Sequence, residues 1–213
     1  MLETEFLPAR KADSKALMIV LHGLGDSTAG YEWMPGVLDL PWMNYLLVNA
    51  PDPYYGGFSW FDFAGNFRPG VERSRKLLFE LLDEQVRKGF PTRETTLFGF
   101  SQGCLMTIDV GLRYPEMFAG LVGISGFVFE PQELVREFTP AARQQRLLVT
   151  HGTMDTMVPL QHTDGAIKEL KAAGINVEWH VLEKDHTIAG QEEVEIIRKF
   201  VEVGYRRETR PSP

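Results

Sequence analysis

The segment Gly99-Phe100-Ser101-Gln102-Gly103 constrains this chain more than any other part of its sequence. An apolar, β-branched run at 95–98 precedes it, and a helical pattern follows it. Gly-x-Ser-x-Gly between a strand and a helix is typical of a nucleophile elbow, a tight turn that holds the serine hydroxyl clear of a sheet. The strained turn brings the chain close to itself, so the residues two before and two after the serine must lack a Cβ atom. The turn also places Ser101 at a helix N-terminus, where free N–H groups favour developing negative charge.

The composition is that of a globular chain large enough for a full hydrophobic core. The 213 residues, of which 44% are hydrophobic and 24% charged, predict one domain spanning 1–213, with a core at about 15–203 and a polar C-terminal tail at 206–213. The formal net charge of −7 argues against a nucleic-acid partner, which needs a basic patch. No run approaches the ~20 apolar residues of a membrane span, and the acidic start of the chain does not resemble a signal peptide. The lone Cys104 excludes an internal disulfide and a cysteine-based zinc cluster, so we expect a cytoplasmic location by default.

Apolar runs alternate with helical patterns along the chain. The predicted strands are 16–21, 45–48, 95–100, 120–124, 146–150 and 176–182, and the predicted helices are 71–88, 102–113, 161–173 and 191–203. Continuous apolar strands separated by helices indicate the α/β class, with a mainly parallel, doubly wound sheet flanked by helices on both faces. Only about twenty residues separate positions 124 and 146, which leaves no room for a large lid domain.

The segment 51–69 is unusually aromatic and also rich in glycine and proline. It contains Tyr54, Tyr55, Phe58, Trp60, Phe61, Phe63 and Phe67. An aromatic loop before a helix, on the side where the strand ends carry function, suggests a wall of a substrate pocket. The alternative is that these rings are ordinary core.

A serine hydroxyl needs a base within hydrogen-bond reach to act as a nucleophile. In this kind of sheet the acid and the histidine follow the serine, each on a loop after a later strand. Of the five histidines, His22 precedes the serine, His180 lies inside a strand pattern, and His151 and His162 flank the best acid candidate. His186 lies after the last strand and before the last helix, which makes it the candidate base. The alternative is a surface histidine in the polar run 183–186.

The candidate acid is Asp155, which follows the strand 146–150 directly. A buried carboxylate there would fix the imidazole tautomer and stabilise the imidazolium. Asp185 is adjacent to His186, but neighbouring side chains on an extended segment point apart. Asp164 falls in the next helix and is typical of a first-turn residue.

The oxyanion of an acyl-transfer intermediate needs preorganised N–H donors. One candidate donor is the backbone N–H of Gln102, and the other is that of Leu24, on the glycine turn after the first buried strand. The alternative is a plain glycine turn. A phosphate-binding loop is disfavoured because neither Gly-x-Gly-x-x-Gly nor a lysine-terminated glycine loop is present.

Four ordered motifs resemble the phospholipase/carboxylesterase family of α/β-hydrolases, which includes acyl-protein thioesterases and small bacterial carboxylesterases. They are His22-Gly23-Leu24-Gly25-Asp26, Ser59-Trp60-Phe61-Asp62, Gly99-Phe100-Ser101-Gln102-Gly103, and His151-Gly152 with Asp155 and Val158-Pro159. The resemblance covers roughly 15–203. It implies a serine hydrolase with Ser101, Asp155 and His186 as its triad, an oxyanion hole at Leu24 and Gln102, and Trp60 near the substrate pocket. The chain departs from the family pattern at Cys104, at Lys184-Asp185 before the base, and in its short aromatic loop after Ile124.

The prediction is a serine esterase or thioesterase without cofactor or metal, acting through an acyl-enzyme on Ser101. Its expected partner is a small-molecule ester or thioester with an apolar acyl group. The candidate substrate-binding residues are Trp60, Phe61, Phe58, Phe127 and Val158. The alternatives are a non-catalytic ligand-binding homologue, an acyltransferase, or a lysophospholipase acting on lipid esters.

Three further features do not require a function. Cys104 is typical of a small buried hydrophobe inside a helix. Ser125 lacks a following helix at elbow spacing, so we do not expect a second nucleophile there. Asp26 and Asp62 lack the spacing of metal ligands and are expected to hold their loops through backbone N–H groups.

Overall fold

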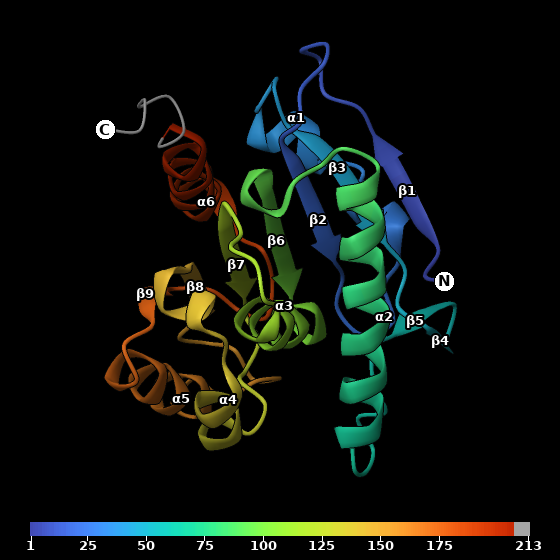
Figure 1. The fold of residues 1–213 in the computed structure, drawn as a ribbon. Helices are drawn as coiled ribbons and strands as arrows, with labels where there is room; N and C mark the ends of the chain where they lie inside the picture. Colours follow the sequence, from blue (N-terminus) through green and yellow to red (C-terminus); the bar gives the residue numbers. More distant parts are fainter. Residues whose placement is uncertain (207–213) are drawn as a thin grey trace.

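The computed structural model describes residues 1–206 and has a seven-stranded sheet at its centre (Figure 1). The sheet order is β1-β3-β2-β6-β7-β8-β9, and every neighbouring pair is parallel except β1 with β3. The strands are β1 Thr4–Leu7, β2 Leu17–Leu21, β3 Asn44–Val48, β6 Thr95–Phe100, β7 Gly120–Ile124, β8 Arg146–Gly152 and β9 Asn176–Leu182. The predicted mainly parallel sheet is therefore confirmed. The predicted polar tail, 206–213, lies outside the described residues apart from the backbone of its first residue.

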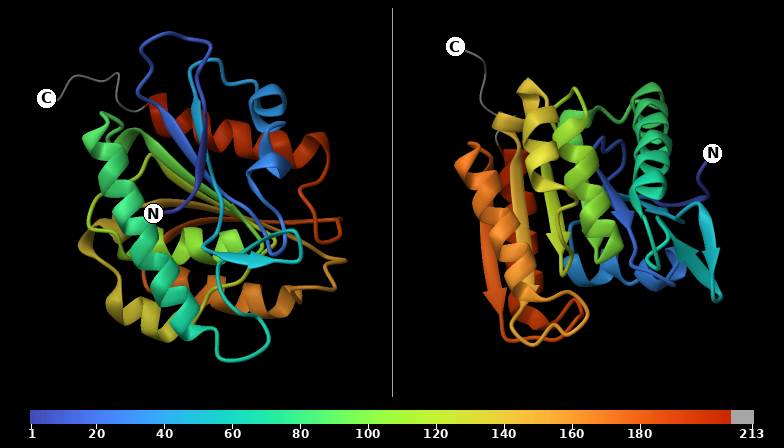
Figure 2. Two further views of the ribbon diagram at one scale, coloured as in Figure 1. Left: turned by 90° about the vertical axis from the view of Figure 1, so that its right-hand side faces the viewer. Right: turned by 90° about the horizontal axis from the view of Figure 1, so that it is seen from below.

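Helices cover both faces of the sheet (Figure 2). They are α1 Met34–Leu38, α2 Arg68–Arg87, α3 Gln102–Arg113, α4 Pro131–Glu137, α5 Leu160–Ala172 and α6 Gly190–Arg206, with 3₁₀ segments at Thr28–Tyr31, Thr92–Glu94 and Pro140–Gln144. Helices α2 to α5 pack on one face, and α1 and α6 pack on the other. The two-layer covering explains why the strands are continuous apolar runs.

Strand β2 illustrates how the two cores are divided. Leu17, Ile19 and Leu21 belong to the core under α2 to α5, whereas Met18 and Val20 belong to the core under α1 and α6. Successive side chains of a strand point to opposite faces, so one strand supplies both cores. All five residues are buried, which fixes the strand in its register.

Five of the strands and α-helices have no counterpart in the sequence prediction, namely β1, β4, β5, α1 and α4. Strand β1 is a short antiparallel edge strand in which exposed and half-buried residues alternate, so it lacks the apolar run by which buried strands are recognised. Strands β4 Asp52–Tyr54 and β5 Gly57–Ser59 form a hairpin inside the segment expected to be a loop. Helix α1 is only one turn long.

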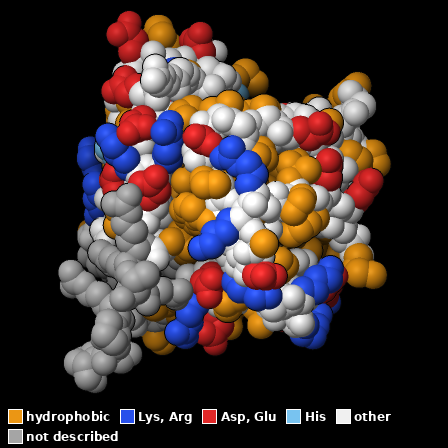
Figure 3. All heavy atoms as spheres, turned by 90° about the horizontal axis from the view of Figure 1, so that it is seen from above, with side chains coloured by type: hydrophobic (Ala, Val, Ile, Leu, Met, Phe, Trp, Pro, Cys, Tyr) orange, Lys and Arg blue, Asp and Glu red, His pale blue; other side chains and the backbone are white. Residues whose placement is uncertain are grey.

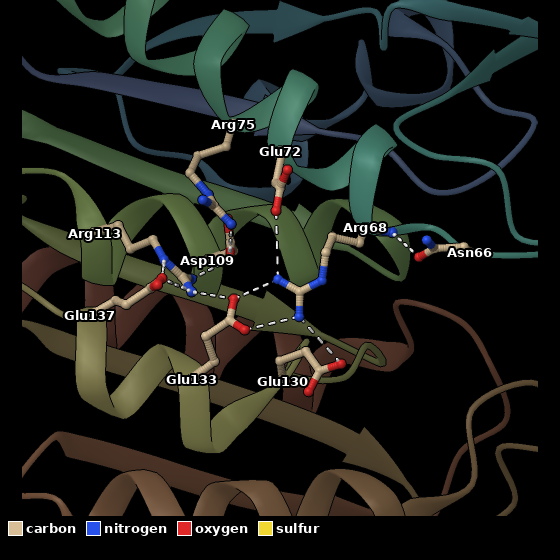
Figure 4. Close-up of polar contacts among 9 residues, drawn as sticks. All are labelled: Asn66, Arg68, Glu72, Arg75, Asp109, Arg113, Glu130, Glu133 and Glu137. Atoms are coloured by element: carbon tan, nitrogen blue, oxygen red, sulfur yellow. Dashed lines mark hydrogen bonds and ion pairs between the residues drawn. The ribbon is translucent and has the colours of Figure 1, made fainter.

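An ion-pair network joins α2, α3 and α4 on the first face (Figure 4). Arg68 makes a two-pronged contact with Glu133, at 2.7 and 2.9 Å, and its guanidinium lies 5.2 Å from the centre of the Phe129 ring. On the next turns, Asp109 of α3 accepts hydrogen bonds from Arg75 of α2 and from Arg113. Paired guanidinium–carboxylate contacts of this kind fix geometry as well as contributing energy. The network holds α4, and the aromatic segment that precedes it, against the start of α2.

The surface carries both signs of charge. On the face in Figure 3, Lys and Arg side chains lie beside Asp and Glu side chains, with apolar side chains between them. Among residues 1–206, no helix is both long enough and apolar enough to cross a membrane.

Candidate active site

The turn between β6 and α3 has the backbone expected of an elbow. Ser101 has φ 53° and ψ −113°, a conformation that L-residues rarely adopt. Its N–H donates to the carbonyl of Ile124 on the neighbouring strand β7, at 2.9 Å. A Cβ atom on Gly99 would lie 2.0 Å from the carbonyl oxygen of Gly103, and a Cβ atom on Gly103 would lie 2.0 Å from that of Leu21. The prediction that both flanking positions must be glycine is confirmed.

We therefore expect Gly103→Ala to lower the free energy of unfolding by more than about 3 kcal/mol, because backbone rather than a flexible side chain must move to admit the methyl group. Gly165→Ala is the matched control, since Gly165 is also helical but a Cβ atom there meets nothing within 4 Å. The control is expected to raise the free energy of unfolding by up to about 1 kcal/mol, because alanine restricts the unfolded chain more than glycine does. Urea denaturation measures both changes. Equal effects of the two substitutions would contradict the crowding argument.

The structure brings together the three residues predicted to form a triad. His186 Nε2 lies 2.9 Å from Ser101 Oγ, and His186 Nδ1 lies 2.8 Å from Asp155 Oδ2. These contacts join residues 85 and 31 positions apart in the sequence. The elbow and the loops after β8 and β9 all follow the carboxyl ends of parallel strands, so they meet at one edge of the sheet.

The Asp155 carboxylate is held by its own loop. Its Oδ1 accepts the backbone N–H groups of Met157, at 3.0 Å, and Val158, at 2.8 Å, which leaves Oδ2 directed at His186. Burial by itself would raise the pKa of Asp155, but the hydrogen bonds from Val158 and His186 outweigh it and hold that pKa below its usual value. The carboxylate is therefore ionised at neutral pH. His151 supports the same loop through the contact of its Nε2 with the Val158 carbonyl, at 2.9 Å.

The glycine turn after β2 is fixed by a buried histidine. The Ala50 N–H donates to His22 Nε2 at 3.1 Å, so the ring proton is on Nδ1 and is donated to the Gly23 carbonyl at 2.6 Å. Burial lowers the pKa of His22, which keeps the ring neutral as this arrangement requires. Leu24, the predicted oxyanion donor, follows directly and borders the same cavity as Ser101 and Gln102.

Trp60 and Phe61 were expected to contact substrate, but the structure places them elsewhere. Both are fully buried in the core and neither lines the cavity at Ser101. The Trp60 indole donates to the His22 carbonyl at 2.9 Å, and its backbone N–H donates to Gln102 Oε1 at 2.9 Å. The Gln102 side chain also donates to the Phe61 carbonyl at 3.0 Å. Trp60 therefore ties the glycine turn to the start of α3, and Phe61 adds a second bond to the Gln102 side chain.

Phe58 likewise has a backbone role and is absent from the cavity lining. Its carbonyl accepts the N–H of Gly25 and its N–H donates to the carbonyl of Asp26, both at 2.9 Å. The hairpin β4–β5 is thereby joined to the glycine turn. Much of the segment 51–69 thus supports the turn, because its glycines let the backbones approach closely: a Cβ atom on Gly57 would lie 2.1 Å from the carbonyl oxygen of Gly25.

A cavity of about 220 Å³ opens at Ser101. Leu24, Gln102 and His186 border it together with Phe127 and Val158, the two predicted substrate-binding residues that the structure does place in the lining. A second cavity, of about 420 Å³, lies next to it. Four side chains line both cavities, namely Phe63, Phe127, Met157 and Val158.

Phe67 and His162 also line the second cavity. The substrate-binding residues predicted from the sequence did not include these two, nor Phe63 and Met157. The position of Met157 offered a signal, because it lies between Asp155 and Val158 on the loop that carries the candidate acid. Phe63 and Phe67 offered none, since nothing in the sequence separates them from Trp60 and Phe61. We call these two adjoining cavities, with their shared apolar wall, the groove.

Comparison with known proteins agrees with this geometry. The chain matches the phospholipase/carboxylesterase family over residues 3–204. The chain belongs to that family of α/β-hydrolases. It is accordingly an ester hydrolase, and the family resemblance drawn from its four motifs is confirmed.

Individual relatives in this family cover most of the chain. Acyl-protein thioesterase 1 of Schizosaccharomyces pombe is 31% identical over 73% of this chain and 75% of the relative. Acyl-protein thioesterase 1 of Yarrowia lipolytica is 29% identical over 92% of this chain and 94% of the relative. The crystal structure of esterase PE8, 28% identical, superposes with a TM-score of 0.83 over 95% of this chain and 98% of that one.

Three other residues considered in the sequence, Cys104, Asp62 and Asp26, have local structural surroundings that the structure describes. Cys104 is buried, and burial raises the pKa of its thiol to about 12, so the thiolate is not formed at neutral pH. Asp62 accepts the N–H of Ala64 and Asp26 accepts that of Ser27, as expected for loop residues. Within residues 1–206, no group of three or more His, Cys, Asp or Glu side chains is arranged to hold a metal ion.

Proposed function

We propose that this α/β-hydrolase cleaves carboxylic esters or thioesters through an acyl-enzyme on Ser101. The main support for this proposal is the unbroken chain of hydrogen bonds from Ser101 Oγ through the His186 ring to the Asp155 carboxylate. His186 Nε2 takes the proton from Ser101 as the oxygen attacks the substrate carbonyl, and then gives that proton to the departing alcohol or thiol. A water molecule, deprotonated by the same nitrogen, attacks the acyl-enzyme and releases the acid.

In this proposal the backbone N–H groups of Leu24 and Gln102 stabilise the oxyanion. Gln102 is the first residue of α3, so its N–H has no partner within the helix and lies at the positive end of the helix dipole. Leu24 borders the same cavity as Gln102 and belongs to the turn held by His22 and Trp60. Two donors on separately anchored segments are preorganised for the developing charge, which is where such donors have their effect.

The proposed substrate has an apolar acyl group bound along the groove walled by Phe63, Phe127, Met157 and Val158. Acyl-protein thioesterase relatives support the inclusion of thioesters. The chain is further proposed to act as one domain and in the cytoplasm, given a family match across 3–204 and a single buried cysteine.

A fluorophosphonate probe and a series of p-nitrophenyl esters and acyl thioesters from acetyl to palmitoyl test the proposal. We expect covalent labelling at Ser101, and kcat/KM rising with acyl length by up to roughly fourfold per methylene, the equivalent of about 0.8 kcal/mol of burial, until the groove is full. Phe127→Ala should lower kcat/KM for octanoyl more than for acetyl substrates. Absence of labelling would favour a non-catalytic binder, and a steady fall from acetyl onward would contradict an apolar acyl group.

A further inference from the structure

Lys184, two residues before His186, buries its charge beneath the loop that carries the histidine. Only 2% of its side chain is exposed, and none of the Glu193 side chain is. The ammonium donates to Glu193 Oε1 at 2.7 Å, to the Thr187 carbonyl at 2.7 Å and to Ser125 Oγ at 3.0 Å. An ammonium has three N–H donors, so every one of them is used.

The bond from Lys184 to Thr187 closes the loop around the histidine. The side chain and the carbonyl that it binds belong to the residues on either side of the dipeptide 185–186, so one hydrogen bond ties its two ends together. Backbone bonds hold the same segment from outside: Lys184 N donates to the Leu182 carbonyl, and Met154 N to the Lys184 carbonyl. A backbone bond from Thr187 N to the Asp185 carbonyl, at 2.9 Å, spans His186 itself. The Lys184 side chain adds a side-chain hydrogen bond across this short loop.

Glu193 fastens this loop to the strands beside the elbow. Its Oε1 also accepts from Thr150 Oγ1 at 2.5 Å, and its Oε2 accepts from Ala189 N at 2.7 Å. The backbone carbonyl of Thr150 accepts the backbone N–H of Ser125 at 2.9 Å. The ion pair thus connects the His186 loop to the ends of β7 and β8, the strand next to the elbow and the strand that leads to Asp155.

A buried ion pair contributes little net stability to a fold, because the cost of desolvating both charges offsets their attraction. Proteins with apolar replacements are often as stable. The reaction proposed above gives Lys184 no proton to move and no contact with substrate. The contact through which Lys184 can affect the reaction is its hydrogen bond to the Thr187 carbonyl, across the His186 loop.

We propose that Lys184 is a positioning residue for this hydrolysis: through Thr187 it holds the His186 ring within reach of both Ser101 and Asp155. The inference rests on the proposed function, since it concerns the same histidine. A displacement of about 1 Å in such a group can cost about 100-fold in rate. Loss of Lys184 should therefore lower kcat by about 10- to 100-fold while KM changes by less than about threefold, because the groove is untouched.

Two single substitutions separate this role from that of the ion pair. Lys184→Met removes both the charge and the donor to Thr187, whereas Glu193→Gln removes the opposite charge and leaves that donor in place. A lysine that loses its proton still has two N–H groups, so Glu193→Gln should keep kcat within about threefold of the wild type. An equal loss of kcat in both variants would overturn the proposal.

The double variant Lys184→Met/Glu193→Gln separates positioning from stability, since it buries no unpaired charge. We expect it to regain the melting temperature lost in Lys184→Met and yet to keep the low kcat, with fluorophosphonate labelling of Ser101 slowed by a similar factor. A double variant with a recovered melting temperature and wild-type kcat would overturn the inference. Failure of the proposed function would be seen differently, as an absence of labelling and turnover in the wild-type chain.

Discussion

Ser101→Ala should abolish ester hydrolysis, lowering kcat by at least about 10⁴-fold with little change in KM. The variant keeps the acyl groove and both oxyanion donors but has no atom to form the acyl-enzyme. Turnover of p-nitrophenyl esters, together with the mass of the protein after incubation with a fluorophosphonate, provides the measurement. Undiminished hydrolysis in the variant would rule out the mechanism.

A companion substitution at the same position tests the strain in the elbow. Ser101→Gly should be equally inactive. Its free energy of unfolding should be about 1–2 kcal/mol higher than that of Ser101→Ala, because glycine adopts φ 53° and ψ −113° without the cost that a Cβ atom carries. Urea denaturation of the two variants measures this difference. Equal stabilities would indicate that the turn is not strained.

Asp155→Asn is expected to lower kcat by about 10³- to 10⁴-fold while the protein remains folded. The amide oxygen of asparagine would keep the two backbone bonds that Asp155 Oδ1 accepts from Met157 and Val158. Its NH₂ group would then face His186 Nδ1, which must become an acceptor. The ring proton moves to Nε2, and that nitrogen can no longer take the proton of Ser101.

Asp185→Asn is the matched control for this prediction. Asp185 is the nearest carboxylate to His186 in the sequence, but it is exposed, and the histidine bonds to Asp155 instead. Its substitution should leave kcat within about twofold, as expected for a surface charge away from the reacting atoms. Steady-state kinetics at constant ionic strength compare the two variants. A larger loss in Asp185→Asn than in Asp155→Asn would reverse the assignment of the acid.

The elements that were predicted correctly have a local cause. The strands β6, β7 and β9 and the helix α3 have the bounds expected from the sequence. Strands β6 and β7 are short apolar runs, and α3 begins at the elbow and ends before Tyr114-Pro115. The elbow is recognisable within five residues. The steric requirement at Gly99 comes from Gly103 in the same motif, whereas that at Gly103 comes from the distant Leu21 carbonyl on β2. Strand β1 was missed because an edge strand needs no apolar run, and its pairing partner β3 lies some forty residues away in the chain.

The aromatic segment shows where local patterns stop being informative. Trp60 and Phe61 are in the core, whereas Phe63, two residues further along, is half exposed and lines the groove. The difference depends on what each ring meets: the Trp60 indole finds the His22 carbonyl, and Phe67 packs against Phe127 and Phe129. Contacts between distant segments are not recorded in the composition of either one.

The sequence by itself determined the fold class, the elbow and the choice of Ser101, Asp155 and His186 as the candidate triad. These depend on the order of strands, the spacing of glycines and the positions of loops, all of which follow from the order of residues in the chain. Tertiary structure alone decided which aromatic rings line the groove and which support the glycine turn. It alone also showed that Lys184 is buried against Glu193 and closes the loop around His186. A lysine in a polar run such as 183–186 is expected to be exposed. Lys184 is buried only because β7, β8 and α6 pack around its loop.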